Sequence, residues 1–322
     1  MLEFRGVGID YVTHRGVVPA VRGVDLTVDA GETLGLAGES GCGKSTLALS
    51  VLRLLPATAK VSGQVLLDGA DVRELNWGQL RAVRWAGASV VFQGAMHALN
   101  PVQRISDQIA EPILIHGGRP AGGVSARVSE LLDRVGLPKG RSRAYPHELS
   151  GGQRQRVMIA MALACEPRLI IADEPTTALD VMVQAQVLDL LAELVAEARV
   201  GLMMISHDLS VLARTCQRLA VMYAGRIVEH GPAAQVVRAP VHPYSAALAG
   251  AFPTIGDVAS RLAPRGLPGD PPDPADLPSG CPFHPRCPKM RDECTEVDVA
   301  LRVAGPDRDA ACVLVDAPGV SR

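Results

Sequence analysis

The stretch TLGLAGESGCGKSTLALSVLRLL, residues 33–55, decides the fold of this 322-residue chain. Its apolar start predicts a buried strand, its glycine-rich middle a tight turn, and its leucine-rich end a helix. Residues 38–45 fit the pattern G-x-x-x-x-G-K-[ST], in which glycines let backbone N–H groups turn inward around a phosphate. Because this pattern requires a preceding strand and a following helix, the stretch predicts a nucleotide-phosphate site in an α/β fold.

The residue types of this loop suit the charges of a nucleoside triphosphate. Lys44 is expected to reach the β- and γ-phosphates, and Ser45 is expected to ligate Mg²⁺. The N-terminus of the predicted helix adds a partial positive charge. The other residues expected to bind the nucleotide here are Gly38, Ser40, Gly41, Cys42, Gly43 and Thr46.

A second motif supplies two acids. LIIADEP, residues 169–175, reads as a central strand with Asp173 at its carboxyl end, where α/β sheets bind ligands. Asp173 is expected to hold Mg²⁺ through water, and Glu174 to polarise the attacking water. The alternative is a strand whose terminal acids only cap a helix, but the presence of Lys44 favours the catalytic interpretation.

The composition excludes several classes of protein. A net charge of −2 gives no broad basic surface, so no nucleic-acid partner is expected. The longest apolar run, residues 157–165, has nine residues, whereas a membrane-spanning helix needs about 20. The N-terminus lacks an apolar signal core, and the seven cysteines do not resemble a secreted disulfide scaffold. The chain is therefore expected to be cytosolic.

Strands and helices are predicted to alternate along most of the chain, which favours a mostly parallel sheet covered on both faces. Residues 1–30 read as short strands, and residues from about 95 to 160 as helices. RLAVMYAGRIVEHG, residues 218–231, predicts a β-hairpin. Residues from about 253 to 280 are rich in proline and glycine, which predicts a linker or an extended wrap before a cluster of cysteines.

Six motifs occur in the order found in ABC ATPases: Gly38–Thr46, Gln93, LSGGQRQR at 149–156, LIIADEP, ALD at 178–180, and His207 in ISHD. Over residues 1–235 the chain therefore resembles the nucleotide-binding subunit of an ABC transporter. The resemblance implies a P-loop NTPase fold of the ABC type, with a RecA-like core, an antiparallel β subdomain and a helical subdomain at about 95–160. Residues 236–322, with HPYSAAL at 242–248 and GCPFHPRC at 280–287, resemble the C-terminal extension of dipeptide/oligopeptide importer ATPases.

The resemblance implies roles for four further residues. Gln93 matches the glutamine that touches Mg²⁺ and the attacking water, and His207 matches the histidine that bonds the γ-phosphate. Asp180 matches the loop that links the two sites of a dimer, and Tyr11 matches the aromatic residue that stacks on adenine.

The polar run LSGGQ, residues 149–153, is expected to bind ATP that is held by another subunit. In the resembling family it contacts the γ-phosphate of ATP bound to the opposite subunit, which implies that Ser150, Gly152 and Gln153 act in trans. Two ATPase subunits would then meet head to tail with two ATP molecules between them. Ser150 is also suited to cap the helix that follows.

These implications define an expected function. The chain is expected to hydrolyse ATP at the cytoplasmic face of the cell membrane and to power the import of dipeptides or oligopeptides. Its expected partners are two transmembrane permease subunits, a second ATPase subunit, identical or different, and an extracytoplasmic solute-binding protein. Nickel or another metal chelate, glutathione and oligosaccharide remain alternative cargoes. A soluble ABC protein of translation or DNA repair is disfavoured, because this chain has one cassette and only 56 residues between Gln93 and Ser150.

Four cysteines, Cys281, Cys287, Cys294 and Cys312, are separated by gaps of 5, 6 and 17 residues. Zinc knuckles use gaps of about two to four residues. Proline follows two of these cysteines, as it follows a cluster ligand in bacterial ferredoxins. Four thiolates would hold a [4Fe–4S] cluster, which the resemblance to importer ATPases also implies, since some of them carry one. Zinc, free thiols or a disulfide remain alternatives.

Such a cluster would have a structural or redox-regulatory role. His284 could also be a ligand, although four cysteines suffice. Of the other cysteines, Cys165 is expected at the end of the helix that LSGGQ opens, and Cys216 in a helix core. Replacement of Cys287 by serine is expected to leave ATP binding at Lys44 largely intact.

Overall fold

A computed structural model describes residues 1–14, 16–94, 98–116, 120–177, 179–251 and 266–315 of the chain. The chain divides into two compact units. The first comprises Met1–Leu2, Val28–Glu32 and Leu67–Met204, and the second comprises Glu3–Thr27, Thr33–Leu66 and Ile205–Arg322. Part of the predicted proline-rich linker, residues 252–265, and Ala178 of the ALD motif lie outside the described residues. The expected division of function near residue 235 stays a prediction.

The first unit contains part of a sheet. In this sheet β7 (Leu169–Asp173) lies between β8 (Gly201–Ser206) and β6 (Ala88–Val91) and pairs in parallel with β6. All five residues of β7 are buried, as predicted for a central strand. The other elements of this unit are β5 (Ala70–Asp71), α2 (Trp77–Ala86), α4 (Ile105–His116), α5 (Val124–Arg134), η1 (Lys139–Arg143), η2 (Pro146–Glu148), α6 (Gly151–Ala162) and α7 (Val181–Ala198). Of these, α2 and α6 pack against strand β6 of the sheet.

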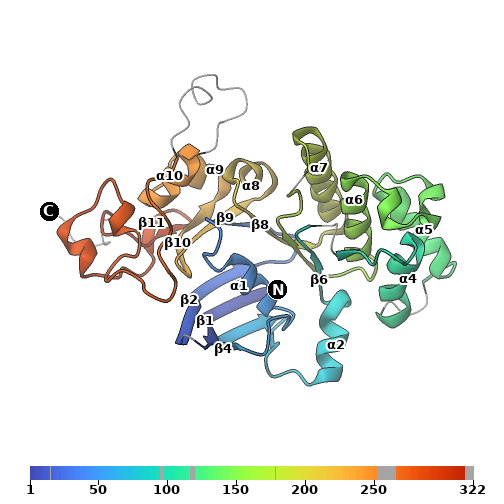
Figure 1. The fold of residues 1–322 in the computed structure, drawn as a ribbon, viewed down its shortest axis with the longest axis horizontal. Coiled ribbons are helices and arrows are strands. Elements are labelled where there is room, and N and C mark those ends of the chain that lie inside the picture. Colours follow the sequence, from blue (N-terminus) through green and yellow to red (C-terminus); the bar gives the residue numbers. More distant parts are fainter. Residues whose placement is uncertain (15, 95–97, 117–119, 178, 252–265, 316–322) are drawn as a thin grey trace. The chain divides into compact units, whose positions relative to one another are not determined.

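Three helices of the first unit pack against one another. Figure 1 shows α4, α5 and α6 gathered into one group, and α6 also contacts α7. This group confirms the helices predicted between residues 95 and 160. The prediction for Cys165 was wrong, because α6 ends at Ala162. The chain cannot continue as a helix beyond this cysteine, since Glu166 has a left-handed φ of 52° and Pro167 follows it.

The second unit contains two groups of strands. In the first group β2 (Gly16–Val28), β1 (Leu2–Thr13) and β4 (Ala59–Leu67) lie side by side in that order. In the second group β3 (Thr33–Ala37) pairs in parallel with β9 (Arg218–Tyr223). β9 and β10 (Arg226–Pro232) form the predicted antiparallel hairpin. The sheet then continues through two strands from the C-terminal region, β12 (Arg308–Ala310) and β11 (Arg302–Gly305).

Short helices accompany this second group of strands (Figure 1). α8 (Leu209–Thr215) packs on β3 and β9, α9 (Ala233–Arg238) packs on β9 and β10, and α10 (Pro243–Ala251) packs on α8 and α9. The C-terminal region adds η3 (His284–Arg286) and η4 (Asp292–Thr295). Among the helices that the structure describes, none combines the length and the apolar character that a membrane span requires.

Two predictions in this unit need correction. α1 (Lys44–Ser50), which follows the phosphate loop, is shorter than the predicted helix through Leu55, because Arg53 has a left-handed φ of 50°. Cys216 is buried, but it lies one residue beyond the end of α8, with an extended backbone.

Candidate active site

Glycines shape the loop between β3 and α1. Gly38 has φ 152° and Gly43 has φ 106°, both in the region that favours glycine. A Cβ atom at Gly38 would collide with the carbonyl oxygen of Met222, and one at Gly43 would collide with that of Ala20. Because Met222 belongs to β9 and Ala20 to β2, two strands hold the loop closely from outside.

The side chain of Lys44 turns back into this loop. It is 6% exposed, and its Nζ donates to the carbonyl oxygens of Gly38 at 2.8 Å and Glu39 at 2.7 Å. The ammonium also lies 3.6 Å from Sγ of Cys42, whose pKa burial raises. The loop therefore holds the ammonium of Lys44 against two of its own backbone carbonyl oxygens.

Tyr11 and His207 are held by different parts of the second unit. The hydroxyl of Tyr11 is 3.2 Å from Oγ1 of Thr46, so β1 places this ring beside α1 and the phosphate loop. His207 is exposed and directly follows β8. The next residue, Asp208, caps α8 by accepting the backbone N–H of Ser210 at 2.8 Å, which fixes the turn that carries His207.

The two acids after β7 lie in the first unit. Asp173 is buried at the end of the strand, with 7% of its surface exposed. Glu174 has φ 43°, a strained backbone conformation that is typical of functional sites. Its Oε2 accepts hydrogen bonds from Nε2 of Gln93 and from Oγ1 of Thr177, both at 2.9 Å. The structure thus brings Gln93 and Glu174 into direct contact.

The LSGGQ run forms the beginning of α6. Ser150 is the N-cap, and its hydroxyl accepts the backbone N–H of Gln153 at 3.3 Å, while the Gln153 side chain accepts the Ser150 N–H at 3.1 Å. A Cβ atom at Gly152 would collide with Val183 of α7, so glycine permits the two helices to approach. Asp180 caps α7 by accepting the N–H of Val183 at 3.0 Å. Ser150 and Asp180 therefore stand exposed at the starts of two neighbouring helices.

The four C-terminal cysteines lie around one small apolar cavity. All four are free thiols, and the backbone N–H of Cys281 donates to the carbonyl of Cys294 at 2.9 Å. Burial raises the pKa of Cys281 to about 11, and that of Cys287 and Cys312 above its usual value. Within the described ranges, no group of three or more Cys, His, Asp or Glu residues converges on a position for a single metal ion.

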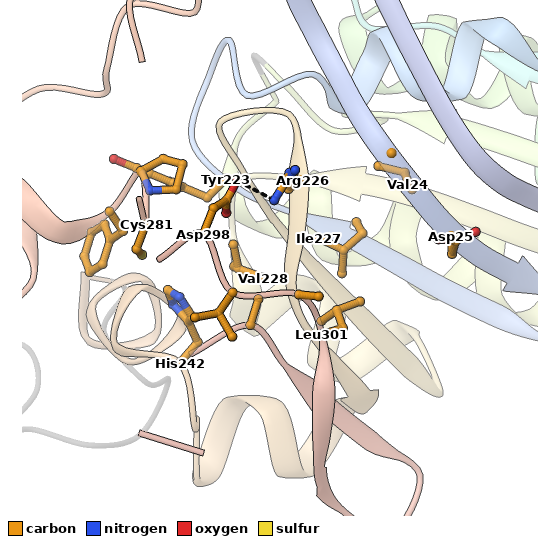
Figure 2. Close-up of a pocket in the computed structure, with 16 residues that line it drawn as sticks. Val24, Asp25, Tyr223, Arg226, Ile227, Val228, His242, Cys281, Asp298 and Leu301 are labelled. Atoms are coloured by element: carbon orange, nitrogen blue, oxygen red, sulfur yellow. Dashed lines mark ion pairs between the residues drawn. The ribbon is translucent and has the colours of Figure 1, made fainter. Parts of the chain in front are cut away.

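His284 lies beside the cysteine cavity but is engaged with backbone. Its Nδ1 is 3.0 Å from the carbonyl oxygen of Cys281. A larger cavity of about 330 Å³ lies next to the cysteines, between β2, β10 and the C-terminal region (Figure 2). Figure 2 shows Tyr223, His242 and Cys281 around this cavity, together with an ion pair between Arg226 and Asp298 at 2.6 Å.

Two charged residues, Arg286 and Glu229, contact these regions although no sequence motif indicates them. Arg286 contacts Glu39 of the phosphate loop, and Glu229, which is fully buried, accepts the backbone N–H groups of Val241 and His242. One signal was present at Glu39, because an acid inside an anion-binding loop needs a cationic partner. Nothing in the local sequence indicates that this partner is Arg286.

Two family models match the chain. The model described as ABC transporter matches residues 21–177, and the model described as oligopeptide/dipeptide transporter, C-terminal region, matches residues 228–294.

Similar proteins agree with these matches over most of the chain. The oligopeptide transport ATP-binding protein OppD of Salmonella typhimurium is 43% identical, over 97% of this chain and 93% of that protein. OppD of Haemophilus influenzae is 44% identical, over 91% of each chain. Among solved structures, the dimeric structure of MJ0796, a bacterial ABC transporter cassette, is 28% identical with a TM-score of 0.64, and the match covers 72% of this chain and 99% of that chain.

Proposed function

Since the chain belongs to the family of oligopeptide transport ATP-binding proteins within the ABC transporters, we propose that its ATPase activity powers the import of peptides. Its fold is the ABC ATPase cassette fold, a P-loop NTPase fold. The observation that carries the proposal is the pairing of a phosphate loop around Lys44 with a C-terminal region like that of oligopeptide transporters.

In the proposed function, the phosphate loop binds the nucleotide. Lys44 neutralises charge on the β- and γ-phosphates, Ser45 supplies a hydroxyl ligand for Mg²⁺, and backbone N–H groups of the loop donate to phosphate oxygens. Tyr11 stacks on the adenine. Two observations support these roles: the burial of the Lys44 ammonium within the loop, and the contact of Tyr11 with Thr46 at the loop's end.

The acids at the end of β7 are proposed to carry the hydrolysis. Glu174 orients the water that attacks the γ-phosphate in line, and Gln93 holds the Glu174 carboxylate and contributes an amide oxygen toward Mg²⁺. Asp173 would hold Mg²⁺ through water, and His207 donates a hydrogen bond to the γ-phosphate. Support comes from the strained backbone of Glu174 and from its two side-chain hydrogen bonds. Oxygen donors of this kind suit a hard cation such as Mg²⁺.

The LSGGQ residues complete a site on a second ATPase subunit. Ser150 and the backbone N–H groups of Gly151 and Gly152 bind the γ-phosphate of the partner's ATP, with Gln153 next to them, and Asp180 contacts the partner's phosphate loop. The exposure of Ser150 at the start of the 12-residue helix α6 supports this role, because a helix N-terminus attracts anions. The partner is a second copy or a different ATPase.

Import of a peptide across a membrane requires further proteins besides the ATPase pair. Two permease subunits hold the ATPase pair at the cytoplasmic face of the membrane, and an extracytoplasmic solute-binding protein delivers the peptide. Residues 1–235 act as the ATPase domain and residues 236–322 as the extension that is typical of peptide importers.

The extension is proposed to hold a [4Fe–4S] cluster on Cys281, Cys287, Cys294 and Cys312. The four free thiols around one apolar cavity support this proposal, because such clusters are bound by four thiolates in sites of low polarity. The cluster would cross-link four separate points of the extension and so stabilise it. His284 is not needed as a ligand, and its Nδ1 already faces the Cys281 carbonyl.

Metal analysis of protein purified without oxygen tests the cluster. About four irons per chain are expected, whereas one zinc would favour a zinc site and the absence of both metals would contradict either. The variant Cys287→Ser should lose the iron. The matched control Cys165→Ser should keep it, because Cys165 is not among the residues around the cavity.

Reconstitution tests the transport function. The chain, its natural ATPase partner and the permeases are placed in vesicles with the solute-binding protein and ATP. Peptide uptake that requires ATP is expected, and the variant Lys44→Ala should abolish it. Uptake of nickel chelate, glutathione or oligosaccharide in place of peptide would contradict the proposed cargo.

A further inference from the structure

Glu39 is an acid within a loop that binds phosphates, and Arg286 neutralises it. Arg286 Nη1 donates to Glu39 Oε2 at 2.7 Å, and Nη2 donates to Oε1 at 2.9 Å. The Arg286 side chain is 6% exposed and the Glu39 side chain 20%, so water screens this pair only weakly. A paired, planar contact of this kind fixes both position and orientation.

Further contacts fix the guanidinium of Arg286 itself. Its Nε donates to the carbonyl oxygen of Pro268 at 2.8 Å, and Nη1 also lies 3.3 Å from the hydroxyl of Tyr223. The guanidinium carbon lies 5.9 Å from the ring centre of Tyr223 and 6.0 Å from that of Phe283, within reach of a cation–π interaction. Arg286 therefore connects the phosphate loop with β9 and with the proline-rich and cysteine-rich segments.

A second residue, Tyr244, holds Glu39 through the backbone. Its hydroxyl accepts the N–H of Glu39 at 2.8 Å. The Tyr244 ring is fully buried, with its centre 4.5 Å from that of Tyr223 and 5.3 Å from that of Phe283. Its own N–H donates to Nδ1 of His242 at 3.0 Å. Figure 2 shows Tyr223, His242 and Cys281 around the same cavity, so the cysteine-rich segment takes part in this packing.

These contacts act on the position of Lys44. The N–H of Glu39 and the carbonyl of Gly38 belong to one planar peptide group. Tyr244 binds the N–H of that group, and Lys44 binds its carbonyl oxygen. Lys44 also binds the carbonyl oxygen of Glu39. Tyr244 thus fixes the peptide group whose carbonyl oxygen binds the ammonium, and Arg286 holds the side chain of Glu39, the residue that supplies the second carbonyl oxygen.

We propose that Arg286 and Tyr244 are positioning residues of the nucleotide site, which hold Glu39 so that the phosphate loop keeps the shape that binds a nucleoside diphosphate or triphosphate. This inference rests on the proposed ATPase function. Because Arg286 lies between Cys281 and Cys287, the fold of the cysteine-rich segment determines how firmly the loop is held. Cys287→Ser is therefore expected to weaken nucleotide binding, in contrast to the expectation from the sequence alone.

Binding of a fluorescent ADP analogue with Mg²⁺ to the purified full chain tests this inference. Arg286→Gln and Glu39→Gln should each raise the Kd about tenfold, and the double variant should be no weaker than Arg286→Gln alone. Arg286→Lys should recover part of the affinity. The control Arg291→Gln should bind as the original chain does, since Arg291 lies in the same segment but is half-exposed and 3.8 Å from Glu293.

The Glu39→Gln variant separates positioning from simple charge effects. Removal of a negative charge beside phosphates would by itself tighten the binding of an anion, so weaker binding is expected only if Glu39 orients the loop. Tyr244→Phe keeps the buried ring and removes only the hydroxyl, and it should also weaken ADP binding. If Arg286→Gln does not fold, the ADP affinity of Tyr244→Phe tests the inference. If the Glu39→Gln and Tyr244→Phe proteins fold and bind ADP normally, the positioning inference is overturned but the proposed ATPase function is not. An original chain that does not bind ADP would overturn the proposed function as well.

Discussion

At the scale of single residues, several residues of the proposed site have backbone φ angles that are positive. Gly38 and Gly43 have positive φ angles that allow the phosphate loop to pass close to Met222 and Ala20. Glu174 has a positive φ although it carries a side chain, and Gln93 and Thr177 hold its carboxylate. Such strain persists only where surrounding contacts impose it. The carboxylate of Glu174 is therefore preorganised.

The variant Glu174→Gln tests the role of that carboxylate. Glutamine keeps the size of the side chain but removes its basicity, so ATP should still bind while kcat falls about 10²–10⁴-fold. ATP hydrolysis by the assembled complex and nucleotide binding by the variant are the measurements. Glu193→Gln, at an exposed position in α7, is the control and should change neither. Turnover near that of the original chain would show that Glu174 is not the base.

The local structure at the motifs could be predicted from local sequence, whereas the roles of the motif residues stay predictions. The phosphate loop, the acids after β7 and the cap at Ser150 each need only a few neighbouring residues, and the structure shows the expected strand, turn or helix at each of them. The partner of Glu39 could not be predicted, because 247 positions separate it from Arg286. Helix ends were also misplaced where a single left-handed residue, such as Arg53, stops a helix that the apolar spacing continues.

At the scale of elements, a buried acid joins the C-terminal region to the hairpin. Glu229 of β10 is fully buried and accepts the N–H of Val241 at 3.0 Å, the N–H of His242 at 2.9 Å, and Nε of Arg308 at 3.1 Å. Arg308 belongs to β12, which pairs with β10. The segment before α10 and strand β12 are thus fixed to one carboxylate, and no sequence motif indicated this role of Glu229.

His242 makes this region sensitive to acid. Burial lowers its pKa from 6.5 to about 4, although Glu229 acts in the opposite direction, and its Nδ1 must stay unprotonated to accept the N–H of Tyr244. Because the unfolded state then binds the proton more readily, the free energy of unfolding should fall as pH decreases from 6.5 to 4. The loss should reach about 3 kcal/mol. Urea unfolding of His242→Asn across this range should show a smaller loss, and an equal loss would contradict this role.

At the scale of the whole molecule, the proposed site is completed by a second subunit. Ser150 and Asp180 lie at the exposed starts of α6 and α7, and within the first unit they are engaged in helix capping. Capping explains a serine at this position, and the close approach of α7 explains Gly152. A phosphate brought by another chain, as proposed, would add a second reason for glycines here, because it requires close approach to backbone N–H groups.

A mixed complex tests this arrangement. One subunit carries Ser150→Arg, its natural partner is intact, and nucleotide trapping is measured separately at each site. The bulky cation should abolish trapping at the site whose phosphate loop lies on the partner, while the Lys44 loop of the altered subunit keeps its own nucleotide. Unchanged trapping at the partner's loop would contradict the head-to-tail model.

The contact between Glu39 and Arg286 also forms late relative to the synthesis of the phosphate loop. The two residues are 247 positions apart, so at about 5–20 residues per second the ribosome adds Arg286 about 10–50 s after Glu39. Throughout that interval the phosphate loop exists without the residue that holds it. If Arg286 has the proposed positioning role, the nascent chain binds nucleotide firmly only after Arg286 has been added, and a product truncated before Arg286 lacks this contact.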